Sequence, residues 1–295
     1  GGYGHHAQWS DDFHHALHVL LTGETAGYYC DYGKIEQLKK AFAEGFVFSG
    51  QYSEHRKCSF GNSSAGLPGE KFVVYNQDHD QIGNRAGGER LPEIVSFDKL
   101  KLTAGLLLTS PFVPMLFMGE EYGEKSPFLY FVDHNDPALN EAVRKGREKE
   151  LKKFAWNEKP PCPSDEHTFL RSKLDHRLKD QMPHKILLEY YKRLIRLRKE
   201  HPVLSRSVKK DQDFWYDEEK KFLIISRKYR TEKVLIIAAF SGQKITLPET
   251  GRWEKIFDSN EDVWLGNATE APGFLNGNQQ FEVAGPGFLV FQKTE

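Results

Sequence analysis

The sequence predicts an α/β fold in residues 1–203, followed by a small antiparallel β-sandwich in residues 204–295. In the first part, two short apolar runs are separated by an amphipathic helix, which is the pattern of a right-handed parallel β-α-β unit. After residue 203 the helical spacing of apolar residues gives way to strand-like segments separated by turns rich in Gly, Asn and Pro. This change in spacing places the predicted domain boundary.

The elements of the first part are predicted from the spacing of apolar residues. Leu17, Leu20 and Leu21 lie on one face of a predicted helix over 13–21, and we expect Asp11 and Asp12 to cap it. Apolar runs at 72–75 and 113–118 predict strands covered on both faces. Residues 53–69, rich in Gly, Ser and Asn, predict a surface loop. Further helices are predicted over 35–42, 97–108, 136–154 and 187–197.

The second part is predicted to be built from strands alone. Turn clusters at 276–278 and 285–287 separate the later strands. The predicted strands are 222–229, 234–240, 244–247, 253–258, 280–283 and 288–292.

Composition excludes several classes of protein. Hydrophobic residues make up 39% of the 295-residue chain, which is enough to build a core and argues against disorder. The net charge of −1 offers no field to attract nucleic acid or anionic lipid, and the apolar runs are too short to span a bilayer. Cys30, Cys58 and Cys162 are far apart and form no CxxC pair, so reduced cysteines and a cytoplasmic location are expected.

Two polar segments follow the predicted parallel strands, where α/β folds place their functional groups. Residues 76–85 read NQDHDQIGNR, a set of side chains suited to binding hydroxyl groups. A turn rich in Asn and Asp caps is the alternative. Residues 119–131 combine acids with aromatics, as sugar recognition requires, although the acids would equally suit the first turn of a helix.

A third polar segment, residues 9–15, lies near the start of the chain. His14 and His18 are spaced to share one helix face, but no third metal ligand is evident and the Glu of an HExxH motif is absent. We therefore expect no metal at this pair of histidines. A polar helix N-terminus is the alternative reading.

These three segments, taken in order, resemble malto-oligosyltrehalose trehalohydrolases of the α-amylase superfamily. Residues 7–18 (AQWSDDFHHALH) are similar to the family's strand-six segment, and residues 75–85 (YNQDHDQIGNR) with 88–91 (GERL) to its strand-seven segment. Residues 115–124 (MLFMGEEYGE) with 127–131 are similar to its strand-eight segment. The resemblance covers nearly the whole chain and implies the C-terminal part of a (β/α)8 TIM barrel, about strands six to eight, followed by a β-sandwich.

The resemblance also implies roles for individual residues. Asp80 corresponds to the transition-state stabiliser of a retaining glycosidase, and His79 to a histidine that binds sugar hydroxyls. The nucleophile and the acid/base of this family follow strands four and five, which have no counterpart in these residues, so we expect the isolated chain to be inactive. Asp78 stands where the family pattern has Asn, and its charge is expected to raise the pKa of one of the two aspartates. The remaining substrate-binding candidates are Gln81, Trp9, Asp11, Glu120 and Phe128.

The function that the resemblance implies is release of trehalose from malto-oligosyltrehalose or a related α-glucan, without a metal or other cofactor. Neither nucleic acid nor membrane is expected as a partner. Three alternatives remain open. Asp80 could form a new carboxylate pair with Glu120 or Glu121. The chain could be a non-catalytic glycan-binding fragment, although core packing is the expected role of its candidate platforms Trp215, Trp253 and Trp264. It could also belong to another enzyme of the superfamily, such as a glycogen branching enzyme.

Overall fold

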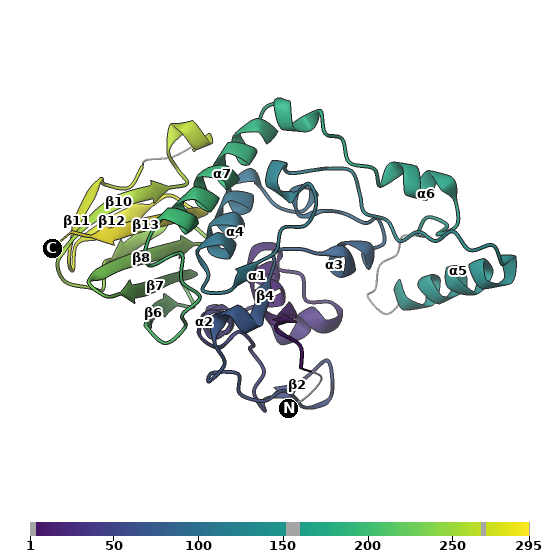
Figure 1. Cartoon of the computed structure of the whole chain (residues 1–295), viewed down its shortest axis with the longest axis horizontal. Coiled ribbons are helices and arrows are strands. Elements are labelled where there is room, and N and C mark those ends of the chain that lie inside the picture. The colour runs from purple at the N-terminus through teal and green to yellow at the C-terminus, as the bar shows by residue number, and fades with distance from the viewer. Residues whose placement is uncertain (1–3, 152–159, 267–269, 295) are drawn as a thin grey trace.

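Three parallel strands form the centre of the first part of the chain. The computed structural model describes residues 4–151, 160–266 and 270–294. Strand β1 (Gln8–Trp9) pairs with β4 (Phe72–Val74), which pairs with β5 (Val113–Pro114), all in parallel. Helices α1 (Asp11–Thr22) and α2 (Ile35–Glu44) connect β1 to β4, and α4 (Phe97–Thr109) connects β4 to β5 (Figure 1).

The predicted strand over 113–118 is wrong in its length and its burial. Only Val113 and Pro114 are assigned to β5, and Met115 N adds one further hydrogen bond to Val74 O. Val113 is 40% exposed and Met118 45%. Among the described residues, β4 is the single strand paired with β5, which makes β5 an edge strand.

The connecting segments contain elements that the sequence did not predict. The expected loop 53–69 begins in a hairpin of β2 (Tyr52–Ser53) and β3 (Cys58–Ser59). A short α3 (His79–Gly83) follows β4, and α6 (Glu166–Arg171) lies beyond α5 (Pro137–Leu151). These elements are too short to show a periodic apolar pattern. The predicted extension of the 136–154 helix beyond Leu151 lies outside the described residues.

The second part is an antiparallel β-sandwich, as predicted. A six-stranded sheet in the order β11-β10-β13-β8-β7-β6 faces a two-stranded sheet of β9 and β12. Trp253 and Trp264 are buried and Trp215 is half-buried, which confirms core packing rather than exposed glycan platforms. The strands are β6 (Gln212–Asp217), β7 (Phe222–Tyr229), β8 (Glu232–Ala239), β9 (Gln243–Thr246), β10 (Arg252–Asp258), β11 (Phe274–Asn276), β12 (Gln280–Val283) and β13 (Gly287–Lys293).

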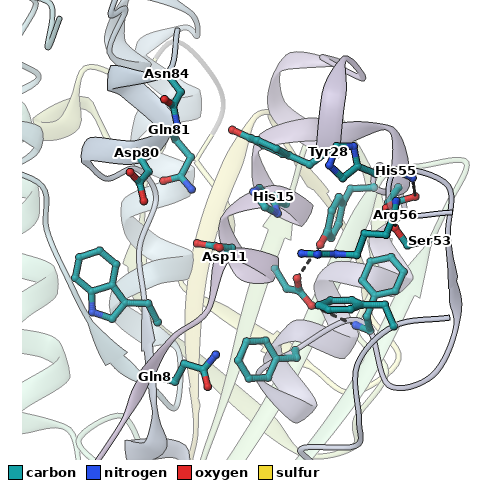
Figure 2. Close-up of a pocket in the computed structure, with 17 residues that line it drawn as sticks. Gln8, Asp11, His15, Tyr28, Ser53, His55, Arg56, Asp80, Gln81 and Asn84 are labelled. Atoms are coloured by element: carbon teal, nitrogen blue, oxygen red, sulfur yellow. Dashed lines mark hydrogen bonds between the residues drawn. The ribbon is translucent and has the colours of Figure 1, made fainter. Parts of the chain in front are cut away.

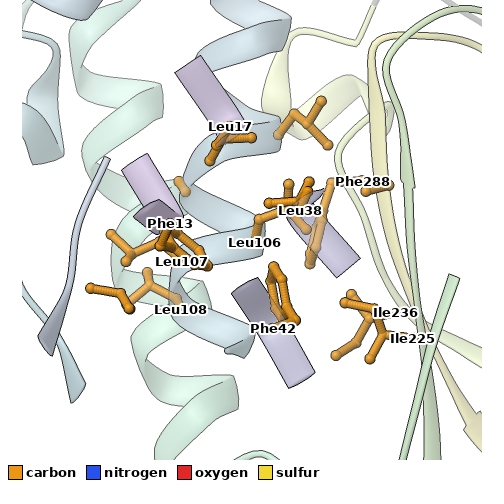
Figure 3. Close-up of a cluster of buried hydrophobic side chains, with 14 of the residues drawn as sticks. Phe13, Leu17, Leu38, Phe42, Leu106, Leu107, Leu108, Ile225, Ile236 and Phe288 are labelled. Atoms are coloured by element: carbon orange, nitrogen blue, oxygen red, sulfur yellow. The ribbon is translucent and has the colours of Figure 1, made fainter. Parts of the chain in front are cut away.

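One apolar core joins the two parts. Helix α4 is the element of the first part that packs on the sandwich, and its buried face contacts β13 and β8 (Figure 3). Helix α7 (His184–Glu200) packs against the same helix. The predicted boundary at residues 203 and 204 falls between α7 and β6, and we retain it as a proposal.

Buried cations reinforce this junction. Lys101 of α4 is fully buried, and its Nζ donates to the carbonyls of Ser259 (2.7 Å) and Trp264 (3.1 Å). The C-terminal end of α4 is held by Arg227, which donates to Thr109 O (2.6 Å), and by Arg198, which donates to Leu108 O (2.8 Å) and Ser110 O (2.7 Å). Cationic groups at these carbonyls satisfy the free acceptors of the helix end.

Candidate active site

A pocket of about 490 Å³ lies where β1 and β4 end. Residues that follow these strands contribute Asp11 and Asp80, so the parallel sheet brings together side chains that are far apart in sequence (Figure 2). Of the predicted site residues, four line this pocket: Trp9, Asp11, Asp80 and Gln81. The other lining residues are Gln8, Asp12, His15, Tyr28, Asp31, Tyr32, Phe46, Phe48, Ser53, His55, Arg56, Phe60 and Asn84.

Asp78 orients the start of α3. Its side chain accepts hydrogen bonds from Asp80 N (2.8 Å) and Gln81 N (3.2 Å), which makes it the N-cap of this helix. Asp78 itself is buried, whereas the Asp80 side chain is 68% exposed. The cap therefore directs the Asp80 carboxylate into solvent at the pocket rather than into the core.

The pKa of Asp78 is raised, as expected for an aspartate where the family pattern has Asn, but repulsion between the two carboxylates is not the main cause. Burial raises the pKa of Asp78 above its ordinary value, and the nearby Asp80 carboxylate adds to the increase, whereas the two backbone N–H donors oppose it. Burial is the largest cause, so desolvation outweighs the repulsion that the sequence suggested.

We expect Asp78→Ala to destabilise the chain by about 1–2 kcal/mol, the usual cost of losing an N-cap. Asp78→Asn retains an oxygen acceptor for the same two N–H groups and should stay within about 0.5 kcal/mol of the parent. Urea unfolding of the three chains measures this difference. Equal losses in the Ala and Asn variants would show that the cap does not hold α3.

Trp9 and Asp11 form the strand-six side of the pocket. Trp9 is 44% exposed and meets the rings of Tyr75 and His79 edge-on, with centroids 5.7 and 5.9 Å away. The Tyr75 hydroxyl donates to Asp11, and burial, followed by this hydrogen bond, raises the pKa of Tyr75. Trp9 thus offers an exposed ring beside carboxylates, the combination that sugars require.

His79 lies at the pocket margin and does not line the pocket itself. Its side chain is 54% exposed, and its Nε2 lies 3.5 Å from Asp80 Oδ1. Both partners of this contact are open to solvent, so it leaves Asp80 available to a ligand.

Glu120 and Phe128 do not line the pocket, which is a correction to the predicted site. Glu120 is buried, and its Oε1 accepts hydrogen bonds from Asn76 Nδ2 and Tyr191 Oη, both at 2.9 Å. Phe128 packs on Phe117, with ring centroids 5.3 Å apart. Glu120 and Phe128 therefore serve packing, whereas Tyr130 and Phe131 of the same segment are exposed. The buried, hydrogen-bonded position of Glu120 also removes the alternative in which it forms a catalytic pair with Asp80.

The histidines of α1 belong to a buried hydrogen-bonded cluster. The ring of His14 bonds to Asn76 O through Nδ1 (2.5 Å) and to Tyr29 Oη through Nε2 (2.9 Å), and burial lowers its pKa. His18 Nε2 bonds to Glu24 at 2.7 Å. Because both ring nitrogens of His14 are hydrogen-bonded, His14 and His18 cannot bind one metal ion together. Within residues 4–151, 160–266 and 270–294, no group of three His, Cys, Asp or Glu side chains is arranged to hold a metal.

The first turn of α1 differs from the prediction. Ser10 occupies the N-cap position, while Asp12 is buried and accepts from Val47 N (2.6 Å), Phe48 N (3.2 Å) and Tyr32 Oη (2.7 Å). Asp12 therefore anchors the chain after α2 to the pocket floor. The two consecutive aspartates at the start of the helix indicated that one of them has a special role. The partners of Asp12 are distant in sequence, so the sequence could not show which role it has.

The sequence reading also missed the far side of the pocket. Ser53, His55, Arg56 and Phe60 come from the segment predicted as a surface loop, and Tyr28 comes from the short turn Gly27–Asp31. The aromatic and basic residues of this loop segment could have indicated that it lines a binding pocket. The three cysteines are free and exposed. None of the helices in the described residues is long and apolar enough to cross a membrane.

Comparison with known proteins agrees with this arrangement. No family model matches the chain. A crystal structure titled as a putative α-amylase from Salmonella typhimurium superposes with a TM-score of 0.80 and 34% identity, covering 98% of this chain and 47% of that one. These features define the chain as the C-terminal part of an α-amylase-type barrel with the β domain that follows it.

The particular family follows from curated sequences. The chain is similar to malto-oligosyltrehalose trehalohydrolases, as the three segments predicted. It is 47% identical over 200 residues to the one from Saccharolobus solfataricus, covering 68% of this chain and 34% of that protein. The one from Brevibacterium helvolum is 42% identical over 252 residues, covering 84% and 42%. The chain thus spans less than half the length of these relatives.

Proposed function

We propose that this chain supplies part of the active site of a retaining glycoside hydrolase that releases trehalose from malto-oligosyltrehalose by cleaving the adjoining α-1,4 bond. The observation that carries the proposal is the Asp80 carboxylate, which is 68% exposed on the wall of a sugar-sized pocket beside Trp9, Asp11 and Gln81. Similarity to enzymes of this name supports the substrate. A cytoplasmic location and a reaction without cofactors are part of the same proposal.

Asp80 would act on the ring whose bond is cleaved. Retaining glycosidases pass through an oxocarbenium-like transition state, in which the distorted ring carries positive charge. A carboxylate held beside that ring stabilises the transition state more than the ground state. The Asp78 cap fixes the backbone of Asp80, so the carboxylate is positioned before substrate binds. His79 at the margin, together with Gln81 and Asp11, would bind the hydroxyls of the same ring.

The nucleophile and the acid/base have no counterpart among the predicted site residues of this chain. In a retaining enzyme these two carboxyl groups lie about 5–5.5 Å apart. Of the two acids after β5 that could pair with Asp80, Glu120 is buried within the protein, whereas Glu121 is only partly buried and does not line the pocket. We therefore propose that the 295-residue chain binds the substrate without turning it over.

Calorimetric titration of the chain with malto-oligosyltrehalose tests the proposal. We expect Asp80→Asn to weaken binding by about tenfold, since a hydrogen bond to a charged group is worth about 1.5 kcal/mol or more. Asp213→Asn, on an exposed strand of the sandwich, is the matched control and should bind as the parent does. Equal affinity of parent and Asp80→Asn would overturn the role of Asp80. Steady hydrolysis by the purified chain that Asp80→Ala abolishes would overturn its predicted inactivity.

A further inference from the structure

A second groove lies outside the pocket that the proposed function uses. Its volume is about 540 Å³, and it is formed by the segment after β5 and the start of α6. Sites that enclose ligands of drug size have volumes of about 300–1,000 Å³. Helices α5 and α6 lie at the end of the molecule opposite the β-sandwich (Figure 1), and no described residue lines both the groove and the pocket. We name it the α6 groove, and its lining includes Phe131, Asp133, Pro163, Asp165, Glu166 and Phe169.

Two exposed aromatic rings give the α6 groove its apolar surface. Phe131 is 39% exposed and Phe169 is 43% exposed, and their ring centroids lie 5.2 Å apart with the ring planes at 64°. Neighbouring exposed rings in a hollow mark a surface that a ligand covers. Two ring faces set at an angle suit a chain of sugar rings that curves, as α-1,4-linked glucose does.

Hydrogen bonds join the two sides of the α6 groove. Val132 N donates to Pro163 O (2.9 Å), and Leu129 N donates to Ser172 Oγ (3.0 Å) at the end of α6. These two bonds fix the segment after β5 relative to α6. The groove is therefore formed before any ligand arrives, so binding costs little ordering of the protein.

Carboxylates supply the polar groups of the α6 groove. Asp165 is the N-cap of α6, and its Oδ1 accepts from His167 N (2.8 Å). In the part of the chain that the structure describes, the side chains of Asp133 and Glu166 have no hydrogen-bond or ion-pair partner. Their oxygens are therefore free to accept from the hydroxyls of a ligand. Free acceptors beside exposed rings are the combination that sugars require.

A neutral ligand fits the α6 groove better than a cationic one. Its carboxylates by themselves would also suit a basic peptide. Lys173 Nζ, however, lies 5.0 Å from the centre of the Phe169 ring and repels a cation at that ring. A sugar is uncharged, and the lysine can donate to its hydroxyls.

Contacts through α5 connect the α6 groove to the pocket at the ends of β1 and β4. Arg147 of α5 lies over the ring of Tyr130, with its guanidinium carbon 4.6 Å from the ring centre. The same guanidinium donates to Asn84 Oδ1 (2.9 Å) and Gly83 O (2.7 Å). Tyr130 precedes Phe131 of the groove, and Asn84 lines the pocket. A glucan chain bound in the groove is thereby tethered to an element that borders the pocket, which raises the local concentration of glucan there.

We propose that the α6 groove is a second carbohydrate-binding site, separate from the active-site pocket, that holds an α-1,4-glucan chain. The sugar rings stack on Phe131 and Phe169, and their hydroxyls donate to Asp133 and Glu166. The inference goes beyond the proposed function, because binding in the groove does not involve any residue of the pocket.

Native electrophoresis in gels that contain soluble starch, together with calorimetric titration with maltoheptaose, tests the second site. Both are carried out on the Asp80→Asn chain, in which binding at the pocket is weakened. We expect starch to retard this chain, and we expect added Phe169→Ala to weaken maltoheptaose binding by about tenfold, because a stacked ring face is lost. Added Phe169→Tyr retains the ring and should leave binding unchanged. Cellohexaose, a straight β-1,4 chain, should bind more weakly than maltoheptaose.

Tyr216→Ala is the matched control. Tyr216 is 38% exposed on β6, outside the α6 groove, so its loss should leave binding unchanged. Phe169 is also exposed, so its variants should fold as the parent does, which urea unfolding of each variant checks.

The outcomes separate this inference from the proposed function. Equal maltoheptaose affinity of the Asp80→Asn chain with and without Phe169→Ala would overturn the second site and leave the function standing. Loss of starch retardation through Asp80→Asn alone would do the same. Equal affinity for cellohexaose and maltoheptaose would overturn the assignment to α-linked glucan. Retardation that Phe169→Ala abolishes, with malto-oligosyltrehalose binding unaffected by Asp80→Asn, would support the second site and overturn the role of Asp80.

Discussion

Gly105→Ala is expected to destabilise the chain by about 2–3 kcal/mol, although alanine is the better helix former. A Cβ at position 105 would lie 2.4 Å from Cγ and Cδ1 of Phe288 and 2.6 Å from its Cδ2. These atoms belong to the base of a fully buried ring, which cannot swing aside. Helix α4 must therefore move away from β13, and the shared core of the two parts must open. Urea unfolding measures the loss.

Gly146→Ala provides the matched control. Gly146 also lies inside a helix, α5, but a Cβ there meets nothing within 4 Å. Its replacement should therefore stabilise the chain by about 0.5–1 kcal/mol, the ordinary gain in helix propensity. Phe288→Leu, combined with Gly105→Ala, should recover part of the loss because the ring is removed. If both glycine variants were stabilised alike, the close contact between α4 and β13 would be contradicted.

The sequence predicted those elements whose apolar residues repeat at a regular spacing. Helix α4 was predicted over 97–108 and spans Phe97–Thr109, because its buried face is almost continuous. Strand β6 was missed because none of its residues is fully buried, so it has no clear apolar face. Strand β11 was missed because it has only three residues. The length of β5 could not be predicted, since it depends on how many strands lie beside it.

The sequence correctly predicted those site residues whose position depends only on the end of the strand beside them. Asp80 and Gln81 lie in the segment after β4 and do line the pocket, and so do Trp9, which ends β1, and Asp11, which follows it. The roles of these four residues in sugar binding stay a prediction. Glu120 also follows a strand, but Tyr191, which is 71 residues away, draws it into the interior. Local composition cannot distinguish an acid that binds a ligand from one that binds a distant side chain.

Glu120→Gln is expected to change how stability depends on pH. Burial raises the pKa of Glu120 to about 7, against hydrogen bonds from Asn76, Tyr191 and the backbone N–H of Phe117, which lower it. The charge of Glu121 adds to the increase. Between pH 4.5 and about 7, the folded chain retains this proton and the unfolded chain releases it. The contribution of Glu120 to stability is therefore greatest at low pH and falls as pH rises through this window.

The expected size follows from the shift in pKa. An increase from 4.5 to about 7 corresponds to at most about 3 kcal/mol of stability lost above pH 7. Glutamine is neutral at every pH, so the variant should gain on the parent by up to that amount between pH 5 and pH 8. His14 and His15, whose pKa values burial lowers, change the stability of both chains in the opposite direction and cancel in the difference.

Urea unfolding of parent and variant at pH 5, 6, 7 and 8 measures this difference. The values at pH 5 are the internal reference, because Glu120 is protonated in the folded chain there and the expected difference between the two chains is the smallest of the four. A constant difference at all four pH values would show that Glu120 does not change its protonation on folding. Because Glu120 accepts from Asn76 (2.9 Å), two residues before the Asp78 cap, its ionisation would also weaken the support of the segment that positions Asp80. A loss of malto-oligosyltrehalose binding by the parent above pH 7, absent in Glu120→Gln, would be the functional sign of the same event.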